Sequence, residues 1–312
     1  MIGSDIETAR NFLMRDQLVA IPTETVYGLA GNALKEEVLV KIFEVKKRPL
    51  FDPLIVHFAQ KNDIKKYVKE IPPLAEKLMD TFWPGPLTIL LPKRKNISDL
   101  VTAGLPEVGV RVPNHESTLL LLRTLPFPIA APSANPFGYI SPTSATHVEK
   151  QLGSEIPYIL EGGATEVGIE STVVRVEDQK IHILRTGGIT AEMLSVFSNN
   201  ITTEDHSSSS PASPGLLSSH YAPRKPFKVG SIEELMGAYS GVKIGVLSFS
   251  QTYSCHLNKV LSAHESLTEA ARNLFAMLRE LDESDCEMVI GEFVPNEGLG
   301  IPINDKLKRA SK

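Results

Sequence analysis

One segment of this chain cannot take part in a hydrophobic core, and it therefore constrains the fold most. Residues 198–226 read SNNITTEDHSSSSPASPGLLSSHYAPRKP, with four consecutive serines and four prolines. Such a polar, proline-rich stretch is typical of a linker between separately folded units. The length of 312 residues also suits two domains of about 150 residues each. We therefore predict a first domain over residues 1–206, a linker over residues 207–224 and a small second domain over residues 225–312.

Composition and charge exclude several classes of protein. Hydrophobic residues make up 42% of the chain and charged residues 22%, as in ordinary globular proteins. The formal net charge of −5 argues against a general polyanion binder, so nucleic acid would need a local basic patch. Cys255 and Cys286 lack a metal-binding spacing, which predicts neither a zinc site nor a disulfide framework.

The expected location is the cytoplasm. A chain with two cysteines and no disulfide pattern suits a reducing compartment. Residues 1–17 lack the basic and apolar regions of a signal peptide. No run of about 18 apolar residues is present, so we expect no membrane span.

The richest polar pattern lies in residues 20–57. A short apolar strand enters a Pro-Thr-Glu-Thr turn, a segment with helical spacing ends in the three adjacent cations at 46–48, and a second apolar strand ends at His57. Hydroxyls and a carboxylate followed by three cations are what a small zwitterion beside a polyphosphate would need. A capped turn with a solvated basic helix end would look the same, so this segment alone leaves both interpretations open.

Further polar groups follow at other strand ends. In the predicted strand 108–112 valines alternate with Gly109 and Arg111, so Arg111 faces away from the side that buries the valines. It is then either a solvated edge residue or a cation that lines a pocket. The loop 131–144 is dense in Ser, Asn, Pro and Gly, and Arg185 ends another predicted strand.

The element pattern predicts an α/β protein. In the first domain we expect strands at 18–21, 54–58, 87–91, 108–112, 128–131, 172–176 and 181–184, with helices at 5–14, 39–46 and 74–82 and another from about Ser144. Short strands with few helices between them favour an α+β domain with a twisted mixed sheet. In the second domain, strands at 243–249, 259–261 and 288–293 alternate with helices at 267–281 and 303–310, which predicts a small Rossmann-like unit.

Several familiar active sites are excluded by their missing motifs. The chain has no Walker loop, no G-x-S-x-G nucleophile elbow, no H-E-x-x-H and no G-x-G-x-x-G. What remains is a set of cations and small hydroxyls at strand ends: Lys46, Lys47, Arg48, His57, Arg111 and Arg185, with Thr23, Thr25, Ser133, Ser141 and Ser171. This set suits the positioning and charge neutralisation of a nucleoside triphosphate.

Seven segments carry a resemblance to a known family. In order they are PTETVYGLAGNA, KKRPLFDPLIVH, FWPGPLTILLP, VGVRVP, APSANPFGYISPT, GIESTVV and ILRTGGI, and they resemble the signature segments of the YrdC family. SPGLLSSHYAP, AARNLFAMLRELD and EGLGIPINDKLKRA resemble the linker and second domain of the long, two-domain form of that family. The resemblance runs from about residue 5 to residue 311.

The resemblance implies a nucleotidyltransferase. Members with this architecture convert L-threonine, bicarbonate or CO₂, and ATP into threonylcarbamoyl-AMP and pyrophosphate, for the threonylcarbamoyladenosine modification of tRNA. It implies Mg²⁺ bound to the ATP and no dedicated protein metal site. It also implies a downstream threonylcarbamoyl transferase complex as partner, a weak contact with tRNA and no membrane.

The resemblance also implies that the sheet of the first domain is concave and has a positively charged cavity, and it assigns roles to residues of this sequence. The threonine end of the cavity would be lined by Thr25, Arg48, His57, Arg111 and Ser171. The ATP end would be formed by Lys46, Asp52, Ser133, Asn135, Ser141 and Arg185, with Tyr221 reaching it from the linker. Lys46 and Arg48 are the expected catalytic residues.

Two residues depart from the family pattern, and one aromatic stands alone. The family commonly has Asn where this chain has Asp52, and a neutral hydroxyl residue where it has Glu107, so the roles of both stay open. Tyr221 is the one aromatic of the linker, where nothing could pack on it. It either anchors the linker to a domain or belongs to a lid over residues 211–224 that closes on ATP.

Two other functions share the expected fold. One is an RNA-binding module without catalysis, which pyrophosphate release dependent on threonine would distinguish. The other is a carbamoyl-transfer domain of the hydrogenase-maturation type, whose zinc-finger and acylphosphatase-like segments this sequence lacks.

Overall fold

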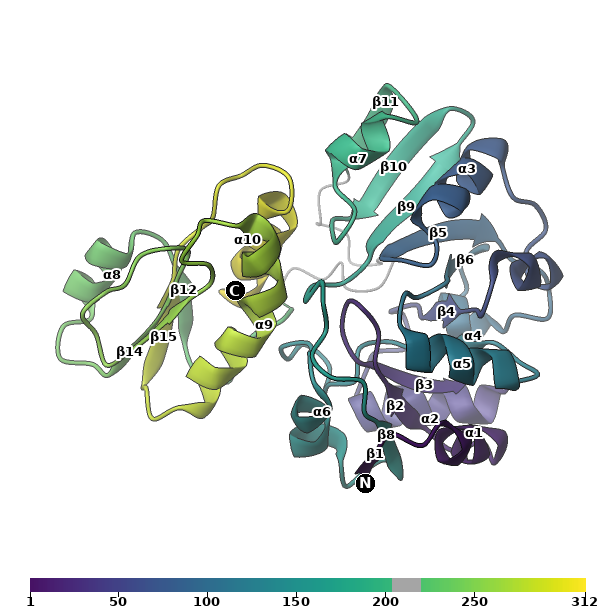
Figure 1. Ribbon diagram of the computed structural model, residues 1–312, viewed down its shortest axis with the longest axis horizontal. Helices are drawn as coiled ribbons and strands as arrows, with labels where there is room; N and C mark the ends of the chain where they lie inside the picture. The colour runs from purple at the N-terminus through teal and green to yellow at the C-terminus, as the bar shows by residue number, and fades with distance from the viewer. Residues whose placement is uncertain (204–219) are drawn as a thin grey trace.

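The computed structural model describes residues 1–203 and 220–312. Within these ranges the strands form one mixed sheet of eleven strands and one parallel sheet of four strands. Figure 1 shows them as a larger unit that contains the N-terminus and a smaller unit that contains the C-terminus. The α/β prediction with a large twisted mixed sheet is confirmed.

The larger sheet has the order β1-β8-β2-β3-β7-β4-β6-β5-β9-β10-β11. Its strands are β1 (Ile2–Gly3), β2 (Val19–Ile21), β3 (Gly28–Asn32), β4 (Ile55–His57), β5 (Leu87–Pro92), β6 (Glu107–Arg111), β7 (Ile129–Ala130), β8 (Tyr158–Leu160), β9 (Thr172–Glu177), β10 (Lys180–Arg185) and β11 (Asn200–Thr203). In the parallel pair of β4 and β6, His57 lies opposite Arg111. Two of the predicted site residues are thereby neighbours.

The helices of the larger unit are α1 (Ile6–Met14), α2 (Glu36–Lys46), η1 (Lys61–Lys66), α3 (Pro73–Phe82), α4 (Asp99–Thr102), α5 (Glu116–Thr124), α6 (Ala145–Leu152) and α7 (Ala191–Ser195). Local chemistry sets their ends. Asp5 begins α1 because its carboxylate accepts the amides of Glu7 and Thr8. Lys47 ends α2 in the left-handed conformation, with φ of 52°. Lys47 is exposed, whereas Lys46 and Arg48 are buried.

The smaller unit is a parallel α/β fold. It comprises β12 (Phe227–Val229), α8 (Ile232–Ala238), β13 (Ile244–Ser248), β14 (Leu257–Val260), α9 (Leu267–Glu283), β15 (Met288–Gly291) and α10 (Gly300–Ala310), with the strand order β12-β15-β13-β14. The side of this unit that carries α9 and α10 faces the larger unit (Figure 1). The Rossmann-like prediction agrees with this parallel arrangement.

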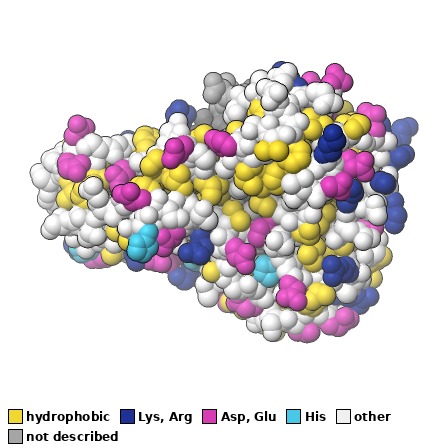
Figure 2. Space-filling model, turned by 45° about the horizontal axis from the view of Figure 1, so that its top comes forward, with side chains coloured by type: hydrophobic (Ala, Val, Ile, Leu, Met, Phe, Trp, Pro, Cys, Tyr) yellow, Lys and Arg dark blue, Asp and Glu magenta, His cyan; other side chains and the backbone are white. Residues whose placement is uncertain are grey.

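The two units share part of their hydrophobic core. Tyr139, Ile140 and Ile169 of the larger unit belong to the same buried cluster as Leu274 and Leu278 of α9. Burying one such aliphatic side chain contributes about 1.5–3 kcal/mol. On the face in Figure 2, hydrophobic side chains also gather where the units meet, whereas charged ones are spread over both. The shared cluster therefore holds α9 against the loops of the larger sheet.

Some sequence predictions need correction. The segment 198–226 is not a linker throughout, because Asn200–Thr203 adds the strand β11 beside β10. Strand β3 was not predicted, since its sequence GLAGN has glycines in place of the usual strand residues. Most of the predicted linker, residues 207–219, lies outside the described residues, as does most of the expected lid. None of the described helices is long and apolar enough to cross a membrane.

Candidate active site

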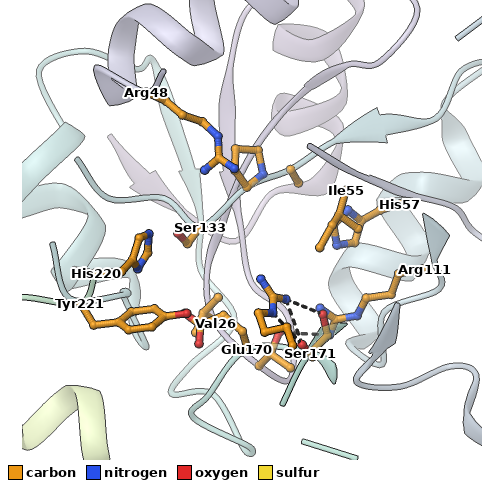
Figure 3. Close-up of a pocket in the computed structure, with 14 residues that line it drawn as sticks. Val26, Arg48, Ile55, His57, Arg111, Ser133, Glu170, Ser171, His220 and Tyr221 are labelled. Atoms are coloured by element: carbon orange, nitrogen blue, oxygen red, sulfur yellow. Dashed lines mark hydrogen bonds between the residues drawn. The ribbon is translucent and has the colours of Figure 1, made fainter. Parts of the chain in front are cut away.

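One cavity collects most of the predicted site residues. It lies where loops leave the larger sheet, and Figure 3 shows arginines, hydroxyls and two rings of the linker around it. Its lining consists of Thr25, Val26, Arg48, Ile55, His57, Arg111, Ala131, Pro132, Ser133, Glu170, Ser171, Arg185, His220 and Tyr221. The structure thus brings together eight of the predicted residues and leaves Lys46, Asp52, Asn135 and Ser141 outside the lining.

Arg111 is a buried cation of the cavity, so the solvated-edge interpretation is wrong. Its Nη2 donates to Thr25 Oγ1 at 3.0 Å and pairs with Glu24 Oε1 at 2.7 Å. Its Nε donates to the carbonyl of Gly85 at 3.1 Å. The carboxylate of the Pro-Thr-Glu-Thr turn therefore holds this arginine, and the Thr25 hydroxyl is oriented with it.

His57 lies beside Arg111 and is neutral at ordinary pH. Burial and, to a smaller extent, the positive charge of Arg111 together lower the pKa of His57 to about 3. Among the described residues, its Nδ1 has no hydrogen-bond partner. An unpartnered buried imidazole nitrogen costs free energy, so a ligand group that bonds to it would be stabilised.

Arg48 is held by the loop that follows it. Its Nη2 lies 2.8 Å from Asp52 Oδ2 and 2.8 Å from the carbonyl of Pro53, and its Nε donates to the carbonyl of Asp52. Asp52 is fully buried and does not line the cavity. The structure therefore places Asp52 as the ion-pair partner of Arg48, outside the lining of the cavity.

Lys46 does not line the cavity, and its side chain instead holds a neighbouring loop. Its Nζ donates to the carbonyls of Ser133 and Asn135 at 2.5 and 2.6 Å. Burial lowers the pKa of Lys46 well below its usual value, the charge of Arg48 adds to this effect, and Asp52 opposes it. The side chain thus anchors the start of the loop 133–141, whose Ser133 reaches the cavity.

Arg185 and Ser171 form a second buried network. Nε and Nη2 of Arg185 donate to the Ser171 carbonyl at 3.0 and 2.9 Å, and Nη2 also donates to Ser171 Oγ at 3.0 Å. Ser171 Oγ lies 2.8 Å from Thr88 Oγ1. Both predicted residues therefore line the cavity with fixed side chains.

Asn135 and Ser141 lie behind the cavity wall. The amide nitrogen of Asn135 donates to the carbonyls of Pro136 and Tyr139. The hydroxyl of Ser141 donates to Glu170 Oε1 at 2.6 Å. Glu170 itself lines the cavity, so it stands between Ser141 and a ligand.

Sequence reasoning missed Glu170 and His220 as cavity residues. Both lie next to residues that were predicted, Glu170 before Ser171 and His220 before Tyr221. The sequence offered only one sign of their role, which is that each lies next to a predicted site residue. A single acid or histidine beside a hydroxyl or an aromatic ring predicts no particular role by itself. Glu107, whose role was left open, pairs with Arg175 at 2.7 Å and does not line the cavity.

Tyr221 is buried and anchors the end of the linker. It is 1% exposed, and its ring lies 4.2 Å from that of His220 and 5.3 Å from that of Phe275.

The cavity encloses about 50 Å³, whereas sites for small molecules usually measure about 300–1,000 Å³. Residues that line the cavity must therefore move before a nucleotide can enter.

The fold and this cavity define a class of protein. Three buried arginines, oriented hydroxyls and a neutral histidine at the loops of a twisted mixed sheet are suited to an enzyme that activates a small acid with a nucleoside triphosphate. Residues 11–187 match a family described as telomere recombination, and residues 189–312 match the family described as threonylcarbamoyl-AMP synthase, C-terminal domain. The chain belongs to the threonylcarbamoyl-AMP synthase family.

Two known synthases are similar in sequence to this chain over nearly its full length, and a third relative matches part of it. The threonylcarbamoyl-AMP synthase of Pyrococcus abyssi is 39% identical over 98% of this chain and 94% of that protein, and the one of Bacillus subtilis is 39% identical over 98% and 92%. The crystal structure of P. abyssi Sua5 complexed with L-threonine has a TM-score of 0.94 over 98% of this chain. A putative threonylcarbamoyl-AMP synthase of Methanocaldococcus jannaschii is 33% identical over only 61% of this chain, which is 88% of its own length.

Proposed function

We propose that this chain makes threonylcarbamoyl-AMP and pyrophosphate from L-threonine, bicarbonate or CO₂, and ATP, and so serves the threonylcarbamoyladenosine modification of tRNA. The observation that carries this proposal is a cavity with three buried arginines in a chain that matches synthases of this name from end to end. The bound L-threonine of the P. abyssi structure, at 39% identity, supports threonine as the amino-acid substrate.

The threonine end of the cavity is the wall formed by Arg111, Thr25 and His57. The positive charge of Arg111 suits the threonine carboxylate, and its bonds to Thr25, Glu24 and the Gly85 carbonyl hold the guanidinium in place for it. The Thr25 and Ser171 hydroxyls can hydrogen-bond to the threonine hydroxyl. Arg185 and Ser133, which we assign to ATP, line the same cavity, so the two substrates would meet within it.

The reaction needs two bond-forming steps. The unprotonated amine of threonine attacks CO₂ derived from bicarbonate, and loss of one proton from nitrogen leaves a carbamate. An oxygen of the carbamate then attacks the α-phosphorus of ATP, and the bond to the β-phosphate oxygen breaks to release pyrophosphate. His57, with a pKa of about 3, is too weak a base to hold the proton. We therefore assign the rate mainly to proximity and orientation, worth roughly 7–11 kcal/mol in well-ordered systems.

Mg²⁺ is the proposed companion of ATP. Glu170 is the acidic residue among those that line the cavity; its Oε1 accepts from Ser141, and its Oε2 lies 3.8 Å from Lys306 Nζ. One carboxylate oxygen and the phosphates of the substrate are the usual ligands of this ion, so the residues present fit it. Bound there, Mg²⁺ would neutralise phosphate charge. Within the described residues, no group of three acidic, histidine or cysteine side chains could hold a metal by itself.

The proposed partners follow from the product. A carbamoyl-adenylate is a reactive anhydride, so a threonylcarbamoyl transferase complex must consume it before water does. A weak contact with tRNA is supported by the exposed cations Lys65, Lys66, Lys69 and Lys95. Figure 2 shows Lys and Arg side chains along the outer edge of the larger unit. RNA binding without catalysis remains the competing function.

Pyrophosphate release tests the proposal. The protein is incubated with ATP, Mg²⁺ and bicarbonate, and each amino acid is added in turn. Release is expected with L-threonine and only when bicarbonate is present. Pyrophosphate release that does not depend on threonine contradicts the proposal. The absence of pyrophosphate release together with tight RNA binding also contradicts it.

A further inference from the structure

The smaller unit inserts two buried cations into the larger one. Arg279 on α9 and Lys306 on α10 are each 1% exposed. Both side chains reach across the interface and bond to groups of the larger unit, as the following contacts show. Neither was predicted as a site residue, because each lies in a helix far along the chain from the cavity motifs.

Arg279 holds the end of the loop 133–141. Its Nε donates to the carbonyl of Ser141 at 3.2 Å, and its Nη2 donates to the carbonyl of Ile140. The guanidinium also lies over the ring of Tyr139, 5.0 Å from its centroid. The start of the same loop is held by Lys46 of the larger unit, so the loop is fixed at both ends by cations from different units.

Lys306 approaches the same loop through a carboxylate. Its Nζ donates to the carbonyl of Thr186 at 3.1 Å and lies 3.8 Å from Glu170 Oε2. The other oxygen of that carboxylate, Glu170 Oε1, accepts from the hydroxyl of Ser141 at 2.6 Å. The contacts of α9 and α10 therefore converge on one serine: Arg279 fixes its carbonyl, and Lys306 acts on its hydroxyl through Glu170.

The chemistry of these contacts indicates a positioning role. Burying a cation is costly, and an apolar contact of the same size would hold two units together at least as well. A charged hydrogen bond, however, adds geometric specificity, because it fixes where its acceptor lies. The shared hydrophobic cluster already provides cohesion between the units.

We propose that the smaller unit sets the ATP end of the cavity, with Arg279 and Lys306 as positioning residues that hold the loop 133–141 and Glu170. This inference rests on the proposed function, because it assumes that the wall formed by Ser133 and Glu170 receives ATP.

The test compares four single variants of the full chain. Arg279→Met and Lys306→Met remove the two cations, while Arg272→Met on α9 and Lys308→Met on α10 remove exposed cations as matched controls. Pyrophosphate release gives kcat and the KM values for ATP and threonine, and thermal unfolding gives Tm. We expect the KM for ATP to rise about tenfold or more in the first two variants, the usual effect of losing a hydrogen bond to a charged group. In these two variants the KM for threonine should stay near that of the unmodified protein. In both control variants, the KM values for ATP and threonine should stay near those of the unmodified protein.

Two further variants keep the result interpretable if Lys306→Met fails to fold. Lys306→Arg retains the charge and should restore the KM for ATP. The pair Lys306→Met with Glu170→Gln removes both charges, so its Tm should recover and show whether an unpaired Glu170 causes any loss of folding. Unchanged KM values for ATP in folded Arg279→Met and Lys306→Met protein overturn the inference, as do equal losses for ATP and threonine. If the unmodified protein releases no pyrophosphate at all, the proposed function fails instead.

Discussion

At the scale of single residues, Arg48 bonds to the loop that follows it and also lines the cavity. Its guanidinium pairs with the buried Asp52 and lines the cavity. Arg48→Ala should lower kcat by about 10²–10³-fold, because a charged donor is lost from a dry site. It should also reduce stability by about 3–5 kcal/mol, because one partner of a buried pair is removed.

A paired variant separates these two effects. Arg48→Ala with Asp52→Asn removes both charges, so its Tm should recover while pyrophosphate release stays low. Full activity in either folded variant would show that Arg48 has only a structural role.

Substrate specificity is also decided by single side chains. Thr25 and Ser171 are buried hydroxyls fixed by Arg111 and Arg185. Serine lacks only the methyl of threonine, so it should lose about 1–3 kcal/mol, or about 10- to 200-fold in kcat/KM. Alanine lacks the hydroxyl, leaves these groups unpaired and should be rejected more strongly. Pyrophosphate release with each amino acid measures both ratios, and alanine turning over as well as threonine would contradict this pocket.

At the scale of elements, the end of the linker acts on the cavity through Tyr221. The ring packs between His220 and Phe275, and its hydroxyl has no partner among the described residues. Tyr221→Ala should raise the KM for ATP several-fold, since each aromatic pair contributes about 0.5–1.5 kcal/mol. It should also increase hydrolysis of the intermediate, because water can enter.

Tyr221→Phe is the matched variant for this element. It keeps the ring and removes the unpartnered hydroxyl, so KM and Tm should stay close to the unmodified protein. If Tyr221→Ala is kinetically silent as well, the aromatic is an anchor without influence on ATP.

At the scale of the whole molecule, buried neutral histidines make stability depend on pH. Burial lowers the pKa of His57 to about 3, of His147 to about 4, and of His220 well below its usual value. In the unfolded chain these groups titrate near 6.5. Their contribution to stability is therefore complete above about pH 6.5 and is lost as the pH falls toward their folded pKa values.

Thermal unfolding between pH 7 and pH 5 measures this dependence. Tm should fall as the pH decreases, and His147→Gln should reduce the proton uptake on unfolding by about one. His264→Gln, at an exposed position, is the control and should leave the slope unchanged. Equal slopes in all three proteins would contradict a neutral, partly buried His147.

The sequence by itself determined the class of fold and most of the chemistry. Alternating apolar residues, turn residues and helix caps are local signals, so the strands that carry His57, Arg111 and Arg185 could be predicted. The order of the seven segments indicated the family, which the comparisons confirmed. Eight of the predicted residues line one cavity for this reason.

Only the tertiary structure decided how charged groups pair. Glu170 and Ser141 are 29 residues apart, and Arg279 lies 138 residues from the carbonyl that it holds. No periodicity links such positions, because the contact depends on how two units pack. The same holds for Lys46, which the sequence places near phosphates and the fold turns toward two carbonyls. Burial makes each of these charges find a partner, and the choice of partner is made by the fold.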